Sequence, residues 1–162
     1  MSFKVFISYS THDLEHVDLL RQQLASTPVS VFIAEHSVRP GNELTSEISK
    51  AIQECDLFVL LWSGNAKDSD WVSQEIGKAH ALNKEILPLM LTEGLSLPGF
   101  ISDLKWLPVF SDSKVALEQA RNIVTSQYNT KISLAQQKEQ EQKNALALMS
   151  LGALLLWAFS QK

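Results

Sequence analysis

Short runs of consecutive apolar residues alternate with segments of helical periodicity over the first two thirds of the chain. Four runs cover residues 5–7, 29–33, 57–62 and 86–91, and a shorter fifth run covers 106–110. Because their apolar residues are nearly continuous rather than alternating, the runs are typical of strands that a parallel sheet buries on both faces. Pro108 predicts an edge position for the fifth strand, since proline has no N–H to donate to a neighbour.

Amphipathic helices are predicted between these strands, from apolar residues spaced three and four apart. The stripes are Leu14, Val17, Leu20 and Leu24; Leu44, Ile48, Ala51, Ile52 and Cys55; Val72, Ile76, Ala79 and Leu82; and Leu117, Ala120, Ile123 and Val124. Asn42 is the expected N-cap of the second helix, and the third begins near Ser69. This alternation predicts an α/β fold: a doubly wound sheet of five parallel strands with helices on both faces.

The composition changes after about residue 128 and no longer follows the α/β pattern. Residues 129–144 are rich in Gln, Lys and Glu, lack Gly and Pro, and predict a polar helical stalk. The uncharged run 145–159 would form a helix about 22 Å long, against a hydrocarbon core of about 30 Å. A continuous helix from 116 to 159 fits this pattern. Three roles stay open for the tail: a membrane anchor, a self-associating helix, or a helix packed on its own domain.

Charge and cysteine content narrow the class of protein. A net charge of −4, with no dense cluster of Lys and Arg, argues against a nucleic-acid partner. The single cysteine, Cys55, falls in an apolar stripe and is expected to be a small buried hydrophobe. One unpaired thiol fits a reducing compartment. The chain enters its first strand directly, so we expect no signal peptide at this end.

Several familiar chemistries lack their motifs. The first strand leads into Ser8 and Tyr9 rather than a glycine-rich turn, and no GxxxxGK[ST] sequence is present. Trp62 and Ser63 occupy the end of the third strand, where a receiver domain needs its phosphoacceptor Asp. His12 and His16 are four residues apart, but no third ligand is evident, so no metal site is predicted.

An aromatic ring and a carboxylate, Trp71 and Glu75, lie four residues apart at the start of the third helix. Residues with this spacing share a helix face, and open α/β folds bind ligands at the carboxyl edge of the sheet. The pair suits a substrate with an aromatic leaving group and a sugar that becomes cationic. Spacing alone favours a simpler interpretation, in which Trp71 flanks the core and Glu75 pairs with Lys78 on a solvated face.

Two loops at the same sheet edge hold further candidates. Residues 8–13 supply hydroxyls and Asp13, which either cap the next helix or meet a ligand phosphate or ribose. After the second strand, Pro40 and Gly41 predict a turn with positive φ at Gly41. Arg39 would then stand at an exposed tip, available to a partner or a phosphate. A plain solvated turn explains this second loop equally well.

Taken together, these motifs resemble the TIR (Toll/interleukin-1 receptor) domain over about residues 4–128. The resemblance rests on four stretches in the family's order and spacing, namely 6–10, 39–41, 60–63 and 69–77. It implies a flavodoxin-like fold. It also divides the chain into a TIR domain at 1–128, a polar stalk at 129–144 and a hydrophobic C-terminal helix at 145–162.

The family includes enzymes that hydrolyse or cyclise NAD⁺ and release nicotinamide, besides adaptors. Glu75 matches the glutamate of those enzymes, so the resemblance implies a catalytic Glu75, with Phe6, Ser8, Tyr9 and Trp71 binding the substrate. It implies NAD⁺ as the substrate, and neither a separate cofactor nor a metal. The sequence is similar to bacterial members of the family, which often act in antiphage defence or cell-death signalling.

The resemblance also implies self-association. Arg39, Pro40 and Gly41 correspond to the family's BB loop, through which one copy helps to build the pocket of the next. We expect the TIR domain in the cytoplasm, with residues 145–159 either anchoring it to the inner membrane or joining copies. The competing hypothesis is a scaffold that binds only other TIR domains and carries Glu75 on its surface.

Overall fold

The strands form one parallel sheet, as the apolar runs predict. The computed structural model describes residues 2–33 and 44–160, with side chains up to residue 149. The strand order is β2-β1-β3-β4-β5, and every neighbouring pair is parallel. The strands are β1 (Phe3–Ser8), β2 (Val29–Ile33), β3 (Leu57–Trp62), β4 (Glu85–Met90) and β5 (Leu107–Pro108). The predicted doubly wound sheet is confirmed, and Pro108 lies in an edge strand.

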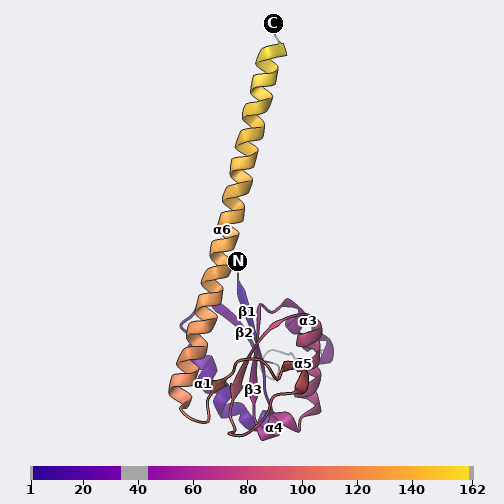
Figure 1. Cartoon of the computed structure of the whole chain (residues 1–162), viewed down its shortest axis with the longest axis vertical. Coiled ribbons are helices and arrows are strands. Elements are labelled where there is room, and N and C mark those ends of the chain that lie inside the picture. The colour runs from indigo at the N-terminus through magenta and orange to yellow at the C-terminus, as the bar shows by residue number, and fades with distance from the viewer. Residues whose placement is uncertain (1, 34–43, 161–162) are drawn as a thin grey trace. The chain divides into compact units, whose positions relative to one another are not determined.

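Helices connect the strands and cover both faces of the sheet, with α3 and α5 on one face and α1 and the first turns of α6 on the other (Figure 1). Their bounds are η1 (Thr11–Asp13), α1 (Leu14–Leu24), α3 (Leu44–Glu54), α4 (Gly64–Lys67), α5 (Asp70–Ala81), η2 (Gly99–Ile101) and α6 (Ser113–Ser160). The predicted stripes face the core except at some ends, where Leu44 and Leu82 are exposed. The short elements were not predicted, because three or four residues show no periodicity. Asn42 lies outside the described residues.

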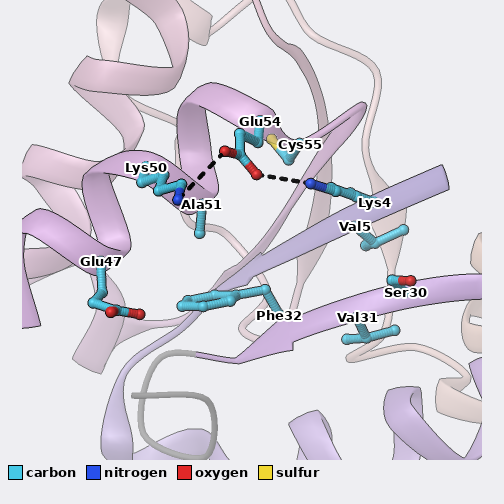
Figure 2. Close-up of a pocket in the computed structure, with 10 residues that line it drawn as sticks. All are labelled: Lys4, Val5, Ser30, Val31, Phe32, Glu47, Lys50, Ala51, Glu54 and Cys55. Carbon is cyan, nitrogen blue, oxygen red and sulfur yellow. Dashed lines mark hydrogen bonds and ion pairs between the residues drawn. The ribbon is translucent and has the colours of Figure 1, made fainter. Parts of the chain in front are cut away.

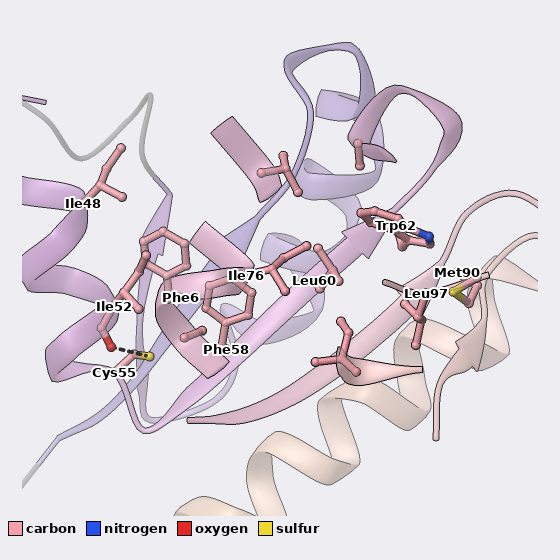
Figure 3. Packing of buried hydrophobic residues seen from close by; sticks show 14 residues of the cluster. Phe6, Ile48, Ile52, Cys55, Phe58, Leu60, Trp62, Ile76, Met90 and Leu97 are labelled. Atoms are coloured by element: carbon pink, nitrogen blue, oxygen red, sulfur yellow. Dashed lines mark hydrogen bonds between the residues drawn. The ribbon is translucent and has the colours of Figure 1, made fainter. Parts of the chain in front are cut away.

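Three phenylalanine rings form a row across the sheet. Phe6 of β1 pairs in register with Phe32 of β2 and Phe58 of β3. The centroid of the Phe6 ring lies 5.4 Å from that of the Phe32 ring and 5.3 Å from that of the Phe58 ring. Helices α3 and α5 add buried isoleucines to the same cluster (Figure 3). This packing holds β1 firmly against α3 and α5, so the residues at the end of β1 have fixed positions.

The chain divides into two units, residues 1–125 and 126–162. Within the first unit, α6 buries Ala116, Leu117, Ala120 and Val124. Within the second, the described apolar side chains are largely exposed, as at Leu146 (66%) and Leu148 (70%). No helix in the described part of the chain has both the length and the apolar character that crossing a bilayer requires. The boundaries at residues 128 and 144, and the role of 145–159, stay predictions.

Phe6→Ala should lower the free energy of unfolding by about 3–5 kcal/mol, because it removes the central ring of the row and leaves a cavity. Phe100→Ala is the matched control, since Phe100 is 50% exposed, and it should change stability by less than about 1 kcal/mol. Urea denaturation measures both. Equal losses in the two variants would contradict the assignment of Phe6 to the core.

Candidate active site

Glu75 is a carboxyl group buried where β1 ends. Helix α5 begins after Ser69, whose hydroxyl accepts a hydrogen bond from the backbone N–H of Val72 at 3.3 Å. One turn further along, Glu75 is only 6% exposed. The hydroxyl of Ser8, the last residue of β1, donates to Oε2 of Glu75 at 2.5 Å. The solvated-face interpretation of Glu75 is therefore wrong, because its partner is a buried serine rather than Lys78.

Burial raises the pKa of Glu75 from an ordinary 4.5 to about 7, because the apolar surroundings penalise the charged form. Hydrogen bonds from the side chains of Ser8 and Trp71 oppose this effect in part, since they favour the carboxylate. The carboxyl group is therefore close to half ionised at neutral pH. A group with this pKa can serve as a charged stabiliser or exchange a proton near physiological pH.

A cavity of about 210 Å³ borders Glu75. Trp71 and Tyr9 line it, and Trp71 is 37% exposed. The remaining lining is Ile7, Thr11, Leu44 and Ile48. The cavity can hold a flat, largely apolar group with a carboxyl group at its wall, and this arrangement agrees with the sequence pairing of Trp71 and Glu75.

Phe6 lies apart from this cavity, and its prediction as a substrate-binding residue is wrong. It is fully buried between two other rings, so no ligand can reach it. Phe6 and Ser8 lie on the same face of β1, because side chains two residues apart in a strand share a face, but Phe6 is deeper in the core. Ser8 is also fully buried and reaches the site only through Glu75. Arg39, Pro40 and Gly41 lie outside the described residues.

A second cavity, of about 410 Å³, adjoins the first. The two share Tyr9, Thr11 and Trp71. The other residues that line the second cavity are Ser10, His12, Asn65, Asp68 and Ser69. Sequence reasoning singled out the loop after β1 but missed Asn65 and Asp68. The signal was available, because these residues follow β3 and so belong to the same carboxyl edge of the sheet.

The Asp13 side chain links the loops that follow β1 and β3 by hydrogen bonds. It is only 8% exposed, and it accepts hydrogen bonds from Ser63 Oγ at 2.5 Å and from Asn65 Nδ2 at 3.3 Å. Ser63 in turn caps α4 by accepting from the backbone N–H of Ala66 at 3.0 Å. Asp13 makes no capping hydrogen bond to α1 with its side chain. The capping role considered for Asp13 is therefore wrong, and its carboxyl group instead fixes the walls of the second cavity.

Another cavity, of about 320 Å³, lies between α3 and the strands β1 and β2 (Figure 2). Both lysines of its lining pair with Glu54, Lys4 at 2.7 Å and Lys50 at 4.0 Å. Glu54 is also well exposed. Burial raises the pKa of the Cys55 thiol to about 11, so no thiolate forms there at neutral pH. This cavity therefore lacks the buried carboxyl group that makes the Glu75 site chemically distinctive.

Comparison with known proteins gives the family and the fold. A model of the TIR domain family matches residues 5–124. A relative from Brachypodium distachyon, named as a probable 2′ cyclic ADP-D-ribose synthase, BdTIR, is 29% identical over an alignment of 135 residues, and the match covers 79% of this chain. The match spans 60% of that relative's own length.

Two solved structures share the fold. The TIR domain of the Toll-related receptor TRR-2 from Hydra magnipapillata has a TM-score of 0.64 and 21% identity, and the match covers 76% of this chain and 97% of that one. The CMP N-glycosidase BcmB from Clostridium botulinum has a TM-score of 0.54 and 22% identity, with coverage of 72% and 97%.

Glu75→Gln should stabilise the protein at high pH. Because the fold raises the pKa of this carboxyl group to about 7, folding favours its protonated form. That contribution to stability is complete below about pH 4.5 and is lost as the pH rises through about 7. The glutamine keeps an acceptor for Ser8 and cannot ionise. At pH 8.5 we expect the variant to be more stable than the wild type by about 2–3 kcal/mol, and at pH 4.5 nearly equal to it.

Urea denaturation at the two pH values measures this difference. Glu118→Gln, at an exposed position on α6, is the matched control for the loss of one negative charge. If Glu75→Gln is more stable than the wild type by the same amount at both pH values, burial of the charged carboxylate is not the cause of the difference.

Proposed function

The chain belongs to the TIR domain family, and from that membership and the buried carboxyl group at its sheet edge we propose that it cleaves the nicotinamide–ribose bond of NAD⁺. The observation that carries the proposal is Glu75, 6% exposed, beside a cavity that Trp71 lines. The relative named as a probable 2′ cyclic ADP-D-ribose synthase supports an NAD⁺-consuming activity. The scaffold alternative loses support, because it expects Glu75 at the surface.

In this proposal the cavity beside Glu75 binds the nicotinamide end of the substrate. Its apolar lining and Trp71 suit the flat nicotinamide ring. Glu75 accepts hydrogen bonds from hydroxyls of the adjoining ribose, which places the carboxylate close to the bond that breaks. Neither a metal nor a further cofactor takes part, and NAD⁺ is the substrate.

The reaction begins with departure of the leaving group. Nicotinamide takes both electrons of the carbon–nitrogen bond and leaves as a neutral molecule, so the ribose carbon becomes oxocarbenium-like. The ionised carboxylate of Glu75 stabilises this positive charge in a site of low polarity, where such an interaction is strong. Water then attacks the carbon and loses a proton, which gives ADP-ribose. A hydroxyl of the second ribose, or the adenine, attacks instead when it lies nearer, and the product is then cyclic.

The name of the relative supports a cyclic product. We extend the proposal to a role in antiphage defence or cell-death signalling, in which loss of NAD⁺ or release of the product is the signal. Self-association through Arg39, Pro40 and Gly41 would complete the pocket and so make activity depend on assembly. Residues 145–159 would promote that assembly either by joining copies or by concentrating them at a membrane.

Glu75→Ala should abolish NAD⁺ cleavage, with a loss of at least about a hundredfold, because it removes the charge that stabilises the transition state. Chromatography with mass detection follows NAD⁺, nicotinamide and the second product. Glu118→Gln should retain wild-type activity. If activity requires assembly, the rate of NAD⁺ cleavage per protein molecule should rise with protein concentration. No nicotinamide release by the wild type at any concentration would refute the proposal and favour the scaffold.

The rate should depend on pH through Glu75. Because the ionised form is the active one and its pKa is about 7, kcat/KM should rise about tenfold per pH unit below 7 and level off above it. Ser8→Ala removes a hydrogen bond that lowers this pKa, so its profile should shift to higher pH. A profile that is flat between pH 5.5 and 8.5 in both proteins would be incompatible with this role for Glu75.

A further inference from the structure

We propose that the cavity of about 320 Å³ between α3 and the strands β1 and β2, here called the α3 cavity, binds a neutral planar aromatic molecule. Its lining shares no residue with that of the cavity beside Glu75. Its volume lies at the lower end of the roughly 300–1,000 Å³ typical of small-molecule sites, which suits a ligand of one or two rings. Figure 2 shows residues of both strands and of α3 at its wall.

Phe32 gives the α3 cavity an aromatic wall. The row of phenylalanine rings runs from Phe58 through Phe6 to Phe32 and ends there, because β2 is an edge strand of the sheet. The rings are nearly parallel, with an angle of 15° between the planes of Phe6 and Phe32. Phe32 is only partly buried and lines the cavity. A further flat ring can therefore pack against Phe32 and extend the row.

Small side chains on the helix leave the space opposite Phe32. Ala51 and Cys55 lie one turn apart and both line the cavity, whereas the larger Ile48 and Ile52 are buried in the core. The Cys55 thiol donates to the carbonyl oxygen of Ile52 at 3.2 Å, and burial raises its pKa to about 11. It is therefore a poor nucleophile at neutral pH, and a ligand is held here without a covalent bond.

The charged side chains of the lining favour a neutral ligand. They comprise two lysines and two glutamates, so their formal charges cancel: Lys4, Lys50, Glu47 and Glu54. Both lysines pair with Glu54. An anionic ligand competes with Glu54 for the lysines, and a cationic ligand competes with the lysines for Glu54. A neutral ring leaves these ion pairs in place and needs no counter-charge against the apolar wall.

Helix α3 connects this site to the cavity beside Glu75. Leu44 and Ile48 of α3 line the cavity beside Glu75, and Ala51 of the same helix lines the α3 cavity. Because a helix transmits displacement as a rigid element, an occupant that holds α3 against Phe32 also fixes the wall formed by Leu44 and Ile48. This consequence rests on the proposed function: occupancy should lower KM for NAD⁺, since a pre-organised wall binds substrate more tightly.

Titration of the full-length chain with indole, a neutral planar probe, tests the site by ¹H–¹⁵N NMR. The amide signals of Ala51 and Cys55 should shift as the α3 cavity fills. Ala51→Phe, which occupies the cavity with its own ring, should weaken binding at least about tenfold. Phe32→Leu keeps an apolar side chain but removes the ring, so binding should weaken about fivefold. Phe100→Leu, at an exposed phenylalanine outside the lining, should bind indole as the wild type does.

Two results would overturn the site. The first is a set of shifts confined to Trp71 and Glu75, which would place indole in the other cavity. The second is equal affinity for indole in the wild type, Ala51→Phe and Phe32→Leu. Tighter binding of indole-3-acetate or tryptamine than of indole would overturn the assignment to a neutral ligand.

Kinetics separate this inference from the proposed function. Saturating indole should lower KM for NAD⁺ about fivefold in the wild type and leave it unchanged in Ala51→Phe. Indole binding that Ala51→Phe abolishes, in a protein that cleaves no NAD⁺, would support the site and refute the activity. NAD⁺ cleavage that depends on Glu75, without indole binding at Ala51, would overturn the site and leave the activity standing. Indole binding at Ala51 with an unchanged KM would overturn the connection through α3.

Discussion

The hydrogen bond between Ser8 and Glu75 is the interaction on which the candidate site depends. It joins the last residue of β1 to the second turn of α5 across 67 positions of sequence. A carboxyl group with 6% of its surface exposed destabilises the fold when it is charged and unpartnered. The serine hydroxyl offsets part of that cost, and it fixes the direction of the carboxyl group. Trp71, one turn earlier on α5, lines the same cavity.

Packing within the sheet fixes the position of this contact. The row of Phe32, Phe6 and Phe58 holds β1 in place up to Ser8, so the position of Ser8 does not depend on a mobile loop. Beyond the strand ends, the buried carboxyl group of Asp13 joins the loops after β1 and β3. The strand β1 thus holds the serine that orients the Glu75 carboxyl group of α5, whereas the hydrogen-bonded loops shape the second cavity. Burial of the Glu75 carboxyl group lowers the stability of the fold, and packing in the aromatic core raises it. Such a trade of stability for a chemically active group is common at functional sites.

Much of this architecture could be predicted from the sequence, because local patterns determine it. The four long strands, the edge position of Pro108 and the start of α5 at Ser69 all follow from apolar runs, proline chemistry and capping. The pairing of Trp71 with Glu75 follows from helical spacing. The burial of Glu75 could not be predicted, since its partner Ser8 is distant in sequence. The contact between Asp13 and Ser63 was missed for the same reason. Phe6 was misassigned because a contiguous motif does not reveal how deep each residue lies.

The most direct test of this account is a titration of the Glu75 carboxyl carbon by ¹³C NMR in the full-length chain. Glu75→Gln identifies the resonance by its disappearance. We expect a midpoint near pH 7, because burial keeps the carboxyl group neutral well above the ordinary pKa of 4.5. A midpoint near 4.5 would show that the carboxylate is solvated. It would contradict the burial from which the proposed chemistry follows.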